Sequence, residues 1–213
     1  MSAFLTSFTP LVSSKAGKIV AKANKINPFI DGSCRREPDF ENDYPAITGL
    51  CRPGFVKRLK KDDIVVYWTN KYGLNANYLV AILQVVEIVE SHTEAEKWYK
   101  NMKIDLPNNI MVKGNNPMPL DKTHYITPKI NSKTDSTIIA EWDAGYLVRS
   151  KKHPHVAICK IWENYLFLDE PTEIKPEDSI KVFNRIPGTQ TPPKLTNDEW
   201  KEFQELLKIK RSI

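Results

Sequence analysis

Cationic side chains are densest in residues 51–61, with the sequence CRPGFVKRLKK. The segment contains no acid and five basic residues, which are Arg52, Lys57, Arg58, Lys60 and Lys61. Pro53 suits the first turn of a helix, and the free N–H groups of such a turn, beside Arg52, would bind a phosphate. The solvated face of an amphipathic helix would show the same pattern. The segment therefore predicts a phosphate-binding edge or an exposed helix face.

The preceding segment, residues 31–43, mixes basic and acidic side chains with one cysteine: Asp31, Cys34, Arg35, Arg36, Glu37, Asp39, Glu41 and Asp43. A guanidinium such as that of Arg35 or Arg36 offers a bidentate fork for a phosphate or for guanine. A carboxylate such as Asp31 would accept from the amino group of a base, or act as a general acid or base. A salt-bridged surface loop is the alternative, because turn-forming residues dominate residues 31–47.

Aromatic residues provide flat faces on which a base can stack. Tyr67 and Trp68 follow one another in a β-branched run, so a strand would place them on opposite faces of its sheet. One of the two therefore packs in the core, and the other faces solvent or a pocket. Core packing remains the ordinary fate of a tryptophan, and we expect it for Trp98 and Trp200 because of their helical positions.

A second basic edge is predicted near residue 150. Lys151 and Lys152 precede His153 and His155, which are two residues apart and have no third ligand near them. We therefore expect no metal site there and no cofactor. The sequence also lacks a Walker loop, GxSxG, HExxH and the zinc-deaminase signature. A hydrolase that uses carboxylates remains open.

The composition is that of an ordinary globular protein. The 213 residues include 41% hydrophobic and 27% charged residues, and 31 basic against 26 acidic side chains leave a net charge of +5. This balance permits an anionic partner without requiring one. The three cysteines form no CxxC pair. With no signal-like start and no long apolar run, we expect a cytoplasmic protein with reduced thiols and no membrane partner.

Hydrophobic patterning predicts many short elements. Expected strands cover residues 3–8, 48–51, 64–69, 78–90, 137–142, 156–161, 165–168 and 179–183. Expected helices cover residues 15–23, a short stretch from Pro53, residues 93–102 and a last segment to about 210. Thr93 with Glu96, and Thr196 with Glu199, have the spacing of capping boxes. Without βαβ alternation, this set favours an α+β domain with a small, partly closed β-barrel.

We expect one domain over residues 1–213. Residues 1–30 would form an N-terminal extension, and residues 31–185 would form the core. Residues 103–136, which are rich in Pro and Asn, would be an irregular insertion in that core. Residues 186–213 would form a C-terminal linker and helix.

Three motifs together point to a known family. They are Asp31-Gly32, then Thr48-Gly49-Leu50-Cys51-Arg52-Pro53, and then Lys60-Lys61-Asp62-Asp63-Ile64-Val65-Val66-Tyr67. This arrangement resembles the nucleotide modification associated domain (Nmad) family, with Cys51-Arg52-Pro53 in place of Cys-Lys-Pro and Asp62-Asp63-Ile64-Val65 in place of Gly-Asp-x-Val. A fainter likeness extends to Ala157–Cys159 and Tyr165–Phe167. Asp62 replaces the turn glycine of the pattern, and residues 103–136 have no counterpart.

The resemblance implies both a fold and a site. The family is associated with phage and bacterial systems that make, read or attack modified DNA bases. It is similar in layout to PUA-like domains, including the EVE and ASCH groups, which read such bases in an aromatic pocket. The resemblance thus implies a PUA-like, partly closed barrel with short flanking helices. Its site would be lined by Asp31, Arg35, Arg36, Cys51, Arg52 and Trp68.

Three functions follow as hypotheses. The first is a nucleic-acid-binding module that reads a modified base, in a DNA-modification or anti-phage defence context. In it, phosphates would bind Arg35, Arg36, Arg52, Lys57, Arg58, Lys60, Lys61, Lys151 and Lys152. The second is a glycosylase or base-modifying transferase in which Asp31, or an acid of residues 37–43, is catalytic. The third is a structural protein that oligomerises through an apolar face. Oligomeric state and the choice of DNA or RNA stay open.

Overall fold

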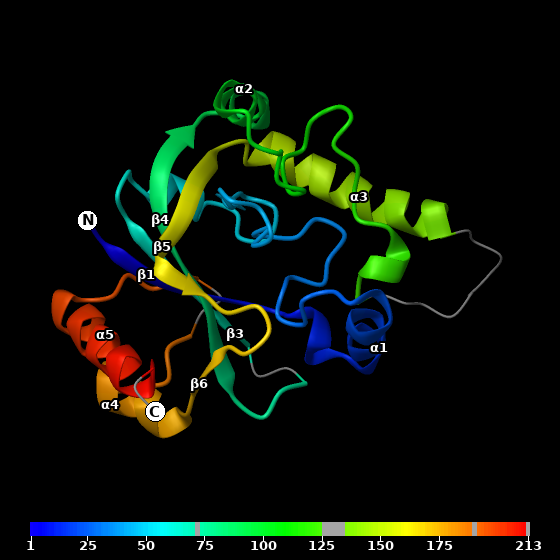
Figure 1. Cartoon of the computed structure of the whole chain (residues 1–213). Coiled ribbons are helices and arrows are strands. Elements are labelled where there is room, and N and C mark those ends of the chain that lie inside the picture. Colours follow the sequence, from blue (N-terminus) through cyan, green and yellow to red (C-terminus); the bar gives the residue numbers. More distant parts are fainter. Residues whose placement is uncertain (71–72, 125–134, 189–190, 212–213) are drawn as a thin grey trace.

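A computed structural model describes residues 1–70, 73–124, 135–188 and 191–211, which form an α+β fold around one curled, half-barrel sheet (Figure 1). The strand order is β1-β3-β4-β5-β2, and β6 pairs with β4. β1 and β3 are parallel, and the other pairs are antiparallel. The strands are β1 (Ala3–Phe8), β2 (Ala46–Ile47), β3 (Ile64–Thr69), β4 (Asn77–Val89), β5 (Val156–Leu166) and β6 (Thr172–Ile174). The predicted α+β class with a partly closed barrel is confirmed.

Helices surround this sheet in the described part of the chain. The five α-helices are α1 (Lys15–Asn24), α2 (His92–Met102), α3 (Asp135–Lys152), α4 (Pro176–Phe183) and α5 (Asn197–Arg211). Three short 3-10 helices are η1 (Leu11–Ser13), η2 (Val56–Arg58) and η3 (Leu120–Lys122). None of these helices is long and apolar enough to cross a membrane.

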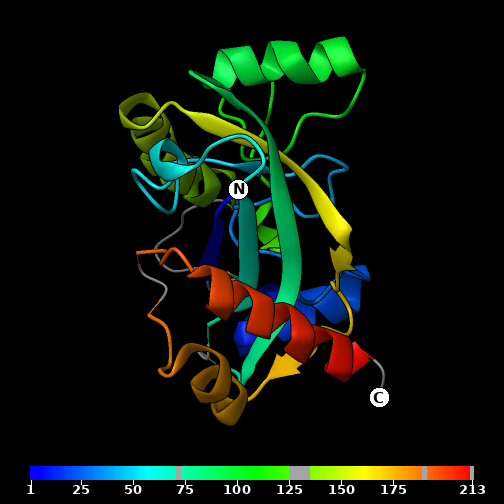
Figure 2. The ribbon, with the colours of Figure 1, turned by 90° about the vertical axis from the view of Figure 1, so that its left-hand side faces the viewer.

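The two faces of the sheet belong to two separate cores, and the alternation of β3 shows this directly. Ile64, Val66 and Trp68 pack with residues of α4 and α5, which lie across that face (Figure 2). Val65 and Tyr67 face the other way and pack with residues of segment 40–59. Side chains with a period of two thus bury both faces of one strand.

The N-terminal segment belongs to the sheet. β1 pairs with β3 over six residues, from Ala3 opposite Ile64 to Phe8 opposite Thr69. Leu5 is fully buried. Residues 3–8 of the expected extension thus form a strand of the sheet, which pairs the backbone N–H and C=O groups along one edge of β3.

Two expected strands are helices. Residues 137–142 lie in α3, where Ile139 and Tyr146, seven residues apart, face the core. Residues 179–183 lie in α4, where Pro176 occupies the first turn and the Asp178 carboxylate accepts from the Lys175 N–H at 2.9 Å. β-branched residues suggested strands, but helical packing against the core overrides that weak preference.

Other boundaries also differ from expectation. The short strand expected at 48–51 is a turn, and β2 lies just before it. The helix expected from Pro53 is the single 3-10 turn η2. The two strands expected at 156–161 and 165–168 are one strand, β5. These segments are short, so the tertiary contacts of their neighbours decide their conformation.

The longer patterned segments are confirmed. β1, β3, β4, α1 and α5 match their predicted positions within a few residues. The second capping box forms as predicted, because Glu199 N–H donates to Thr196 Oγ1 at 3.1 Å and Thr196 N–H donates to Glu199 Oε2 at 2.8 Å. In α2, however, Ser91 rather than Thr93 is the capping residue and accepts from Glu94 N–H at 3.2 Å.

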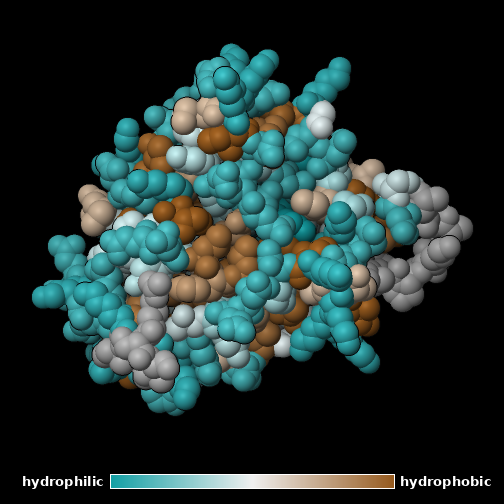
Figure 3. Space-filling view, viewed as in Figure 1, coloured by the Kyte–Doolittle hydropathy of each residue, from teal (hydrophilic) through white to brown (hydrophobic). Residues whose placement is uncertain are grey.

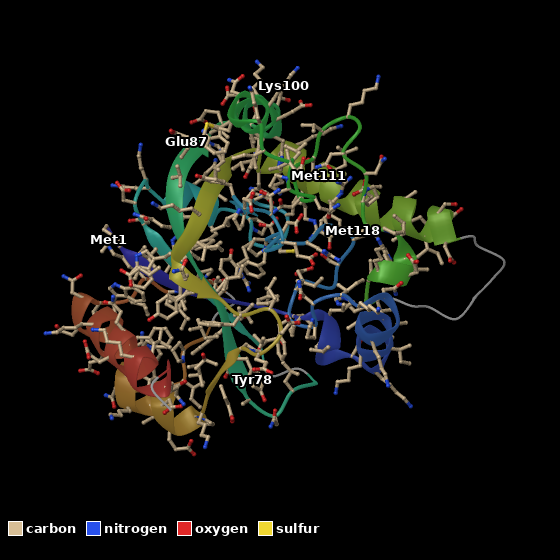
Figure 4. All side chains as sticks on the ribbon, viewed as in Figure 1. Met1, Tyr78, Glu87, Lys100, Met111 and Met118 are labelled. Carbon is tan, nitrogen blue, oxygen red and sulfur yellow. The ribbon has the colours of Figure 1, made fainter. Side chains whose placement is uncertain are left out.

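The expected insertion at 103–136 is irregular only in part. Residues 103–124 contain η3 alone, residues 125–134 lie outside the described residues, and α3 begins at Asp135. Met111 and Met118 mark the course of this segment between α2 and α3 (Figure 4). The Met118 N–H donates to the Cys34 carbonyl at 2.8 Å. The segment therefore packs on the 31–43 loop instead of projecting from the fold.

Candidate functional site

A cavity of about 560 Å³ lies between the sheet, the loop of residues 31–58 and α3. Figure 1 shows the first part of this loop, in blue, between the sheet and α3. The face in view is mainly hydrophilic, with hydrophobic residues gathered toward its middle (Figure 3). The lining residues are Ser7, Phe8, Thr9, Asp31, Ser33, Glu37, Ile47, Thr48, Cys51, Arg52, Phe55, Tyr67, Asn70, His124 and Tyr146. The volume is that of a small-molecule site, which typically spans about 300–1,000 Å³.

Aromatic rings form one wall of the cavity. Phe8 and Tyr67 come from the neighbouring strands β1 and β3, with ring centroids 6.4 Å apart. Phe40 supports both rings from behind, 5.3 Å from each, in edge-to-face geometry. Such packing holds the rings rigidly, and a planar ligand could stack on the face of one of them. Tyr146 of α3 also lines the cavity.

Asp31 is the acid best placed for chemistry in this cavity. The residue is 8% exposed, and one carboxylate oxygen accepts from the Ser33 N–H at 2.7 Å. Burial raises the pKa of Asp31 from 3.8 to about 6, against the opposing effect of the Ser33 hydrogen bonds. Its neighbour must be glycine, because a Cβ at Gly32 would lie 2.3 Å from His124 Nδ1. Glycine at position 32 therefore permits the close approach of His124, whose backbone N–H donates to the Gly32 carbonyl at 2.8 Å.

Glu37 lines the same cavity but is held by its surroundings. Its carboxylate accepts from the Thr48 N–H at 2.6 Å, from the Thr48 hydroxyl and from Asn109 Nδ2 at 2.9 Å. Burial raises the pKa of Glu37 to about 7, and the charge of Asp31 contributes in the same direction. Asn109 also donates to the Ala46 carbonyl at 2.7 Å. Glu37 thus joins segment 103–124 to the turn after β2.

Arg52 brings a cation to the cavity. Its Nε donates to Thr6 Oγ1 at 2.7 Å, and its Nη2 donates to the Ser7 carbonyl. These contacts with β1 fix the guanidinium beside the aromatic wall. The predicted neighbourhood of Asp31, Cys51 and Arg52 is therefore present, since all three residues line one cavity.

Trp68 is not part of this cavity. It is 2% exposed and packs edge to face with Phe183 of α4, with centroids 6.2 Å apart. Tyr67 occupies the cavity face instead. The sequence placed the two residues on opposite faces correctly, but the assignment of Trp68 to the site is wrong. The reason is that α4 and α5 cover the face to which Trp68 points.

Arg35 and Arg36 do not line the cavity. Arg35, which is 3% exposed, forms a bidentate ion pair with Asp143, with Nε–Oδ1 at 2.6 Å and Nη2–Oδ2 at 2.9 Å. Arg36 is equally buried and pairs with Glu41. Both guanidinium groups therefore stabilise the loop, and the structure corrects their assignment as ligands of a phosphate or a base.

The two basic segments of the sequence meet in space. Lys57 lines a small hollow together with His153 and His155. A Cβ at Gly49 would lie 2.4 Å from His153 Cβ, so only glycine permits this approach of the end of α3 to the loop. The exposed basic residues of the two segments are Lys57, Arg58, Lys60, Lys61, Lys151 and Lys152. All six were predicted as phosphate-binding residues.

Cys51 links this basic surface to the cavity. The residue is exposed yet lines the cavity, and burial of its thiol, together with the charges of Asp31 and Glu37, raises its pKa. The charges of Arg149 and Arg52 act on the same thiol in the opposite direction. The mouth of the cavity therefore lies close to cationic groups from both basic segments.

Several lining residues had no signal in the sequence. Phe8, Tyr146 and His124 come from three segments far apart in the chain, and each looked like an ordinary residue of its segment. Only the alternation at Tyr67 indicated a second candidate beside Trp68. In the described residues, no group of three or more His, Cys, Asp or Glu side chains is arranged to hold a metal ion.

A groove of similar volume lies between α4 and α5, on the other side of the sheet. Its lining alternates basic and acidic surface residues, among them Lys181, Asp198 and Glu202. It lacks the aromatic wall and buried acid of the first cavity, so the first cavity is the better candidate site. Comparison of the chain with protein-family models, curated proteins and solved structures finds no match.

Proposed function

We propose that this protein binds nucleic acid, with one base in the cavity and the neighbouring phosphates on the basic surface. One observation carries the proposal: an aromatic-walled cavity with a buried acid opens beside the junction of the two basic segments. Flat rings accept the face of an extruded base, and Asp31 can accept from its amino group. The Lys and Arg side chains outside supply sequence-independent affinity for phosphates.

We propose further that the bound base carries a chemical modification. A cavity of about 560 Å³ leaves room for a base together with a substituent. The resemblance of residues 31–67 to the Nmad family supports a base in DNA that carries a modification, and a role in modification or defence. In this proposal Arg52 is fixed beside the aromatic wall, and Asp31 reads the edge of the base.

An enzyme acting on the same base is the second candidate. The observation in its favour is Asp31, a buried acid with a pKa of about 6 at the wall of a cavity. Such an acid can exchange a proton near neutral pH or stabilise a sugar cation. Asp31→Asn distinguishes the two, because an enzyme loses turnover with binding retained. A binding module has no turnover to lose.

Neutralising the basic surface is expected to weaken binding to every nucleic acid tested. In the triple variant Lys57→Ala, Lys60→Ala, Lys61→Ala, each lost phosphate contact reduces the salt dependence of log K by about 0.9. Titration of fluorescent duplex and single-stranded DNA over a range of salt concentrations measures this slope. The matched control is Lys15→Ala, Lys18→Ala, Lys22→Ala on α1, whose lysines are equally exposed. Absence of binding by the unmodified protein at low salt would refute the proposed function.

A bulky side chain at position 51 is expected to close the cavity to a base. Cys51 lines the cavity, so the indole ring of Cys51→Trp would occupy space that a base needs. Loss of base stacking would reduce affinity about 5- to 150-fold, and phosphate binding would remain. Cys51→Ser, which keeps the size of the side chain, is the control. Unchanged affinity of Cys51→Trp would show that the base binds elsewhere.

A further inference from the structure

A second, smaller hollow of about 220 Å³ adjoins the cavity on α3. Its lining residues are Cys34, Trp142, Tyr146 and Arg149. The three α3 residues are spaced by four and three positions, so they project from one side of the helix. Tyr146 lines both the hollow and the cavity. The two spaces therefore share one aromatic side chain.

The chemistry of the hollow suits a planar ring. The Arg149 guanidinium lies over the Tyr146 ring, 4.4 Å from its centroid. Trp142 is half-buried and adds a second aromatic surface. None of the described residues that line the hollow is acidic, and the carboxylate of Asp143 on the same helix is paired with Arg35. Aromatic and guanidinium planes together favour stacking of a base and attract its phosphate.

We propose that this hollow binds the base adjacent to the one held in the cavity. The inference rests on the proposed function and names its substrate class: a strand that presents two consecutive unstacked bases. The hollow is smaller than sites that hold a whole small-molecule ligand, about 300–1,000 Å³, so it fits a ring and leaves the sugar and phosphate outside. Arg149 then faces the phosphate that joins the two nucleotides. Single-stranded DNA, or a locally opened duplex, meets this requirement.

The test compares mononucleotides with dinucleotides. The probes are 5′-phosphorylated deoxynucleotides, with and without base substituents, and the dinucleotides that extend each of them by one residue. We expect the second nucleotide to raise affinity about 5- to 150-fold, as one stacked base does. Trp142→Ala removes most of this gain and leaves mononucleotide affinity unchanged. Trp142→Phe, which keeps a ring and the packing of α3, retains part of the gain.

A control variant and a fluorescence measurement test whether the gain in affinity comes from the hollow. Leu147→Ala, at an exposed position of the same helix, is the matched control and leaves both affinities unchanged. Quenching of tryptophan fluorescence by the dinucleotide, beyond that by the mononucleotide, disappears in Trp142→Phe. Equal affinities for the two probes, or a gain that Trp142→Ala keeps in full, overturn the inference and leave the proposed function standing. Failure of every probe and of longer DNA to bind overturns the proposed function itself.

Discussion

Replacing Arg35 with alanine is expected to lower the free energy of unfolding by about 3–5 kcal/mol, the usual cost of removing one partner of a buried ion pair. Arg35 joins three segments. Its Nε and Nη2 bind Asp143 of α3, and its Nη1 donates to the carbonyls of Asn108 and Asn115, each at 2.9 Å. Removal of the guanidinium leaves the Asp143 carboxylate, which is 22% exposed, without its cation. Both carbonyls also lose their donor.

Urea unfolding of Arg35→Ala, Asp143→Ala and the double variant measures this contribution. The double variant is expected to be less destabilised than the sum of the single variants, because neither charge is left unpaired. Arg149→Ala on α3, the helix of Asp143, controls for loss of a less buried arginine. If Arg35→Ala keeps full stability and loses affinity for DNA, Arg35 is a ligand, as its sequence context predicted.

Replacing Asp31 with asparagine is expected to stabilise the protein at pH 8 by up to about 3 kcal/mol, at 1.36 kcal/mol per pKa unit. Burial raises the pKa of Asp31 from 3.8 to about 6, so the folded protein binds this proton more tightly than the unfolded chain. An amide has no charge to desolvate, and its oxygen can still accept from the Ser33 N–H. The same substitution removes the carboxylate that would read the base, so stability rises while base discrimination falls.

The sign of the pH dependence follows from the same shift. Between about pH 4 and 6 the unfolded chain releases the Asp31 proton before the folded protein does, so stability falls as pH rises. Glu37, with a pKa of about 7, extends the fall toward neutral pH. Urea unfolding from pH 4 to 8 is expected to show a smaller fall in Asp31→Asn than in the unmodified protein. Asp105→Asn, at an exposed position, is the control, and identical pH profiles for all three proteins would contradict the burial of Asp31.

The basic side chains that the sequence predicts as phosphate ligands differ in exposure for a physical reason. Exposed lysines such as Lys57 and Lys151 keep the positions expected of them, because a long charged side chain on a surface needs no particular partner. Arg35 and Arg36 look the same in sequence, yet both are buried. Their carboxylate partners make burial possible. The partner of Arg35, Asp143, is more than 100 residues away, so no local pattern reveals it.

Elements with a regular alternation of side chains could be predicted from the sequence. The alternation of residues 64–69 placed Tyr67 and Trp68 on opposite faces, and two basic segments were visible at residues 51–61 and 149–155. Which face borders the cavity depends instead on the packing of distant elements. α4 and α5 cover Trp68, whereas the 31–58 loop and α3 leave space over Tyr67. Such choices depend on contacts between residues far apart in the chain, which local periodicity does not encode.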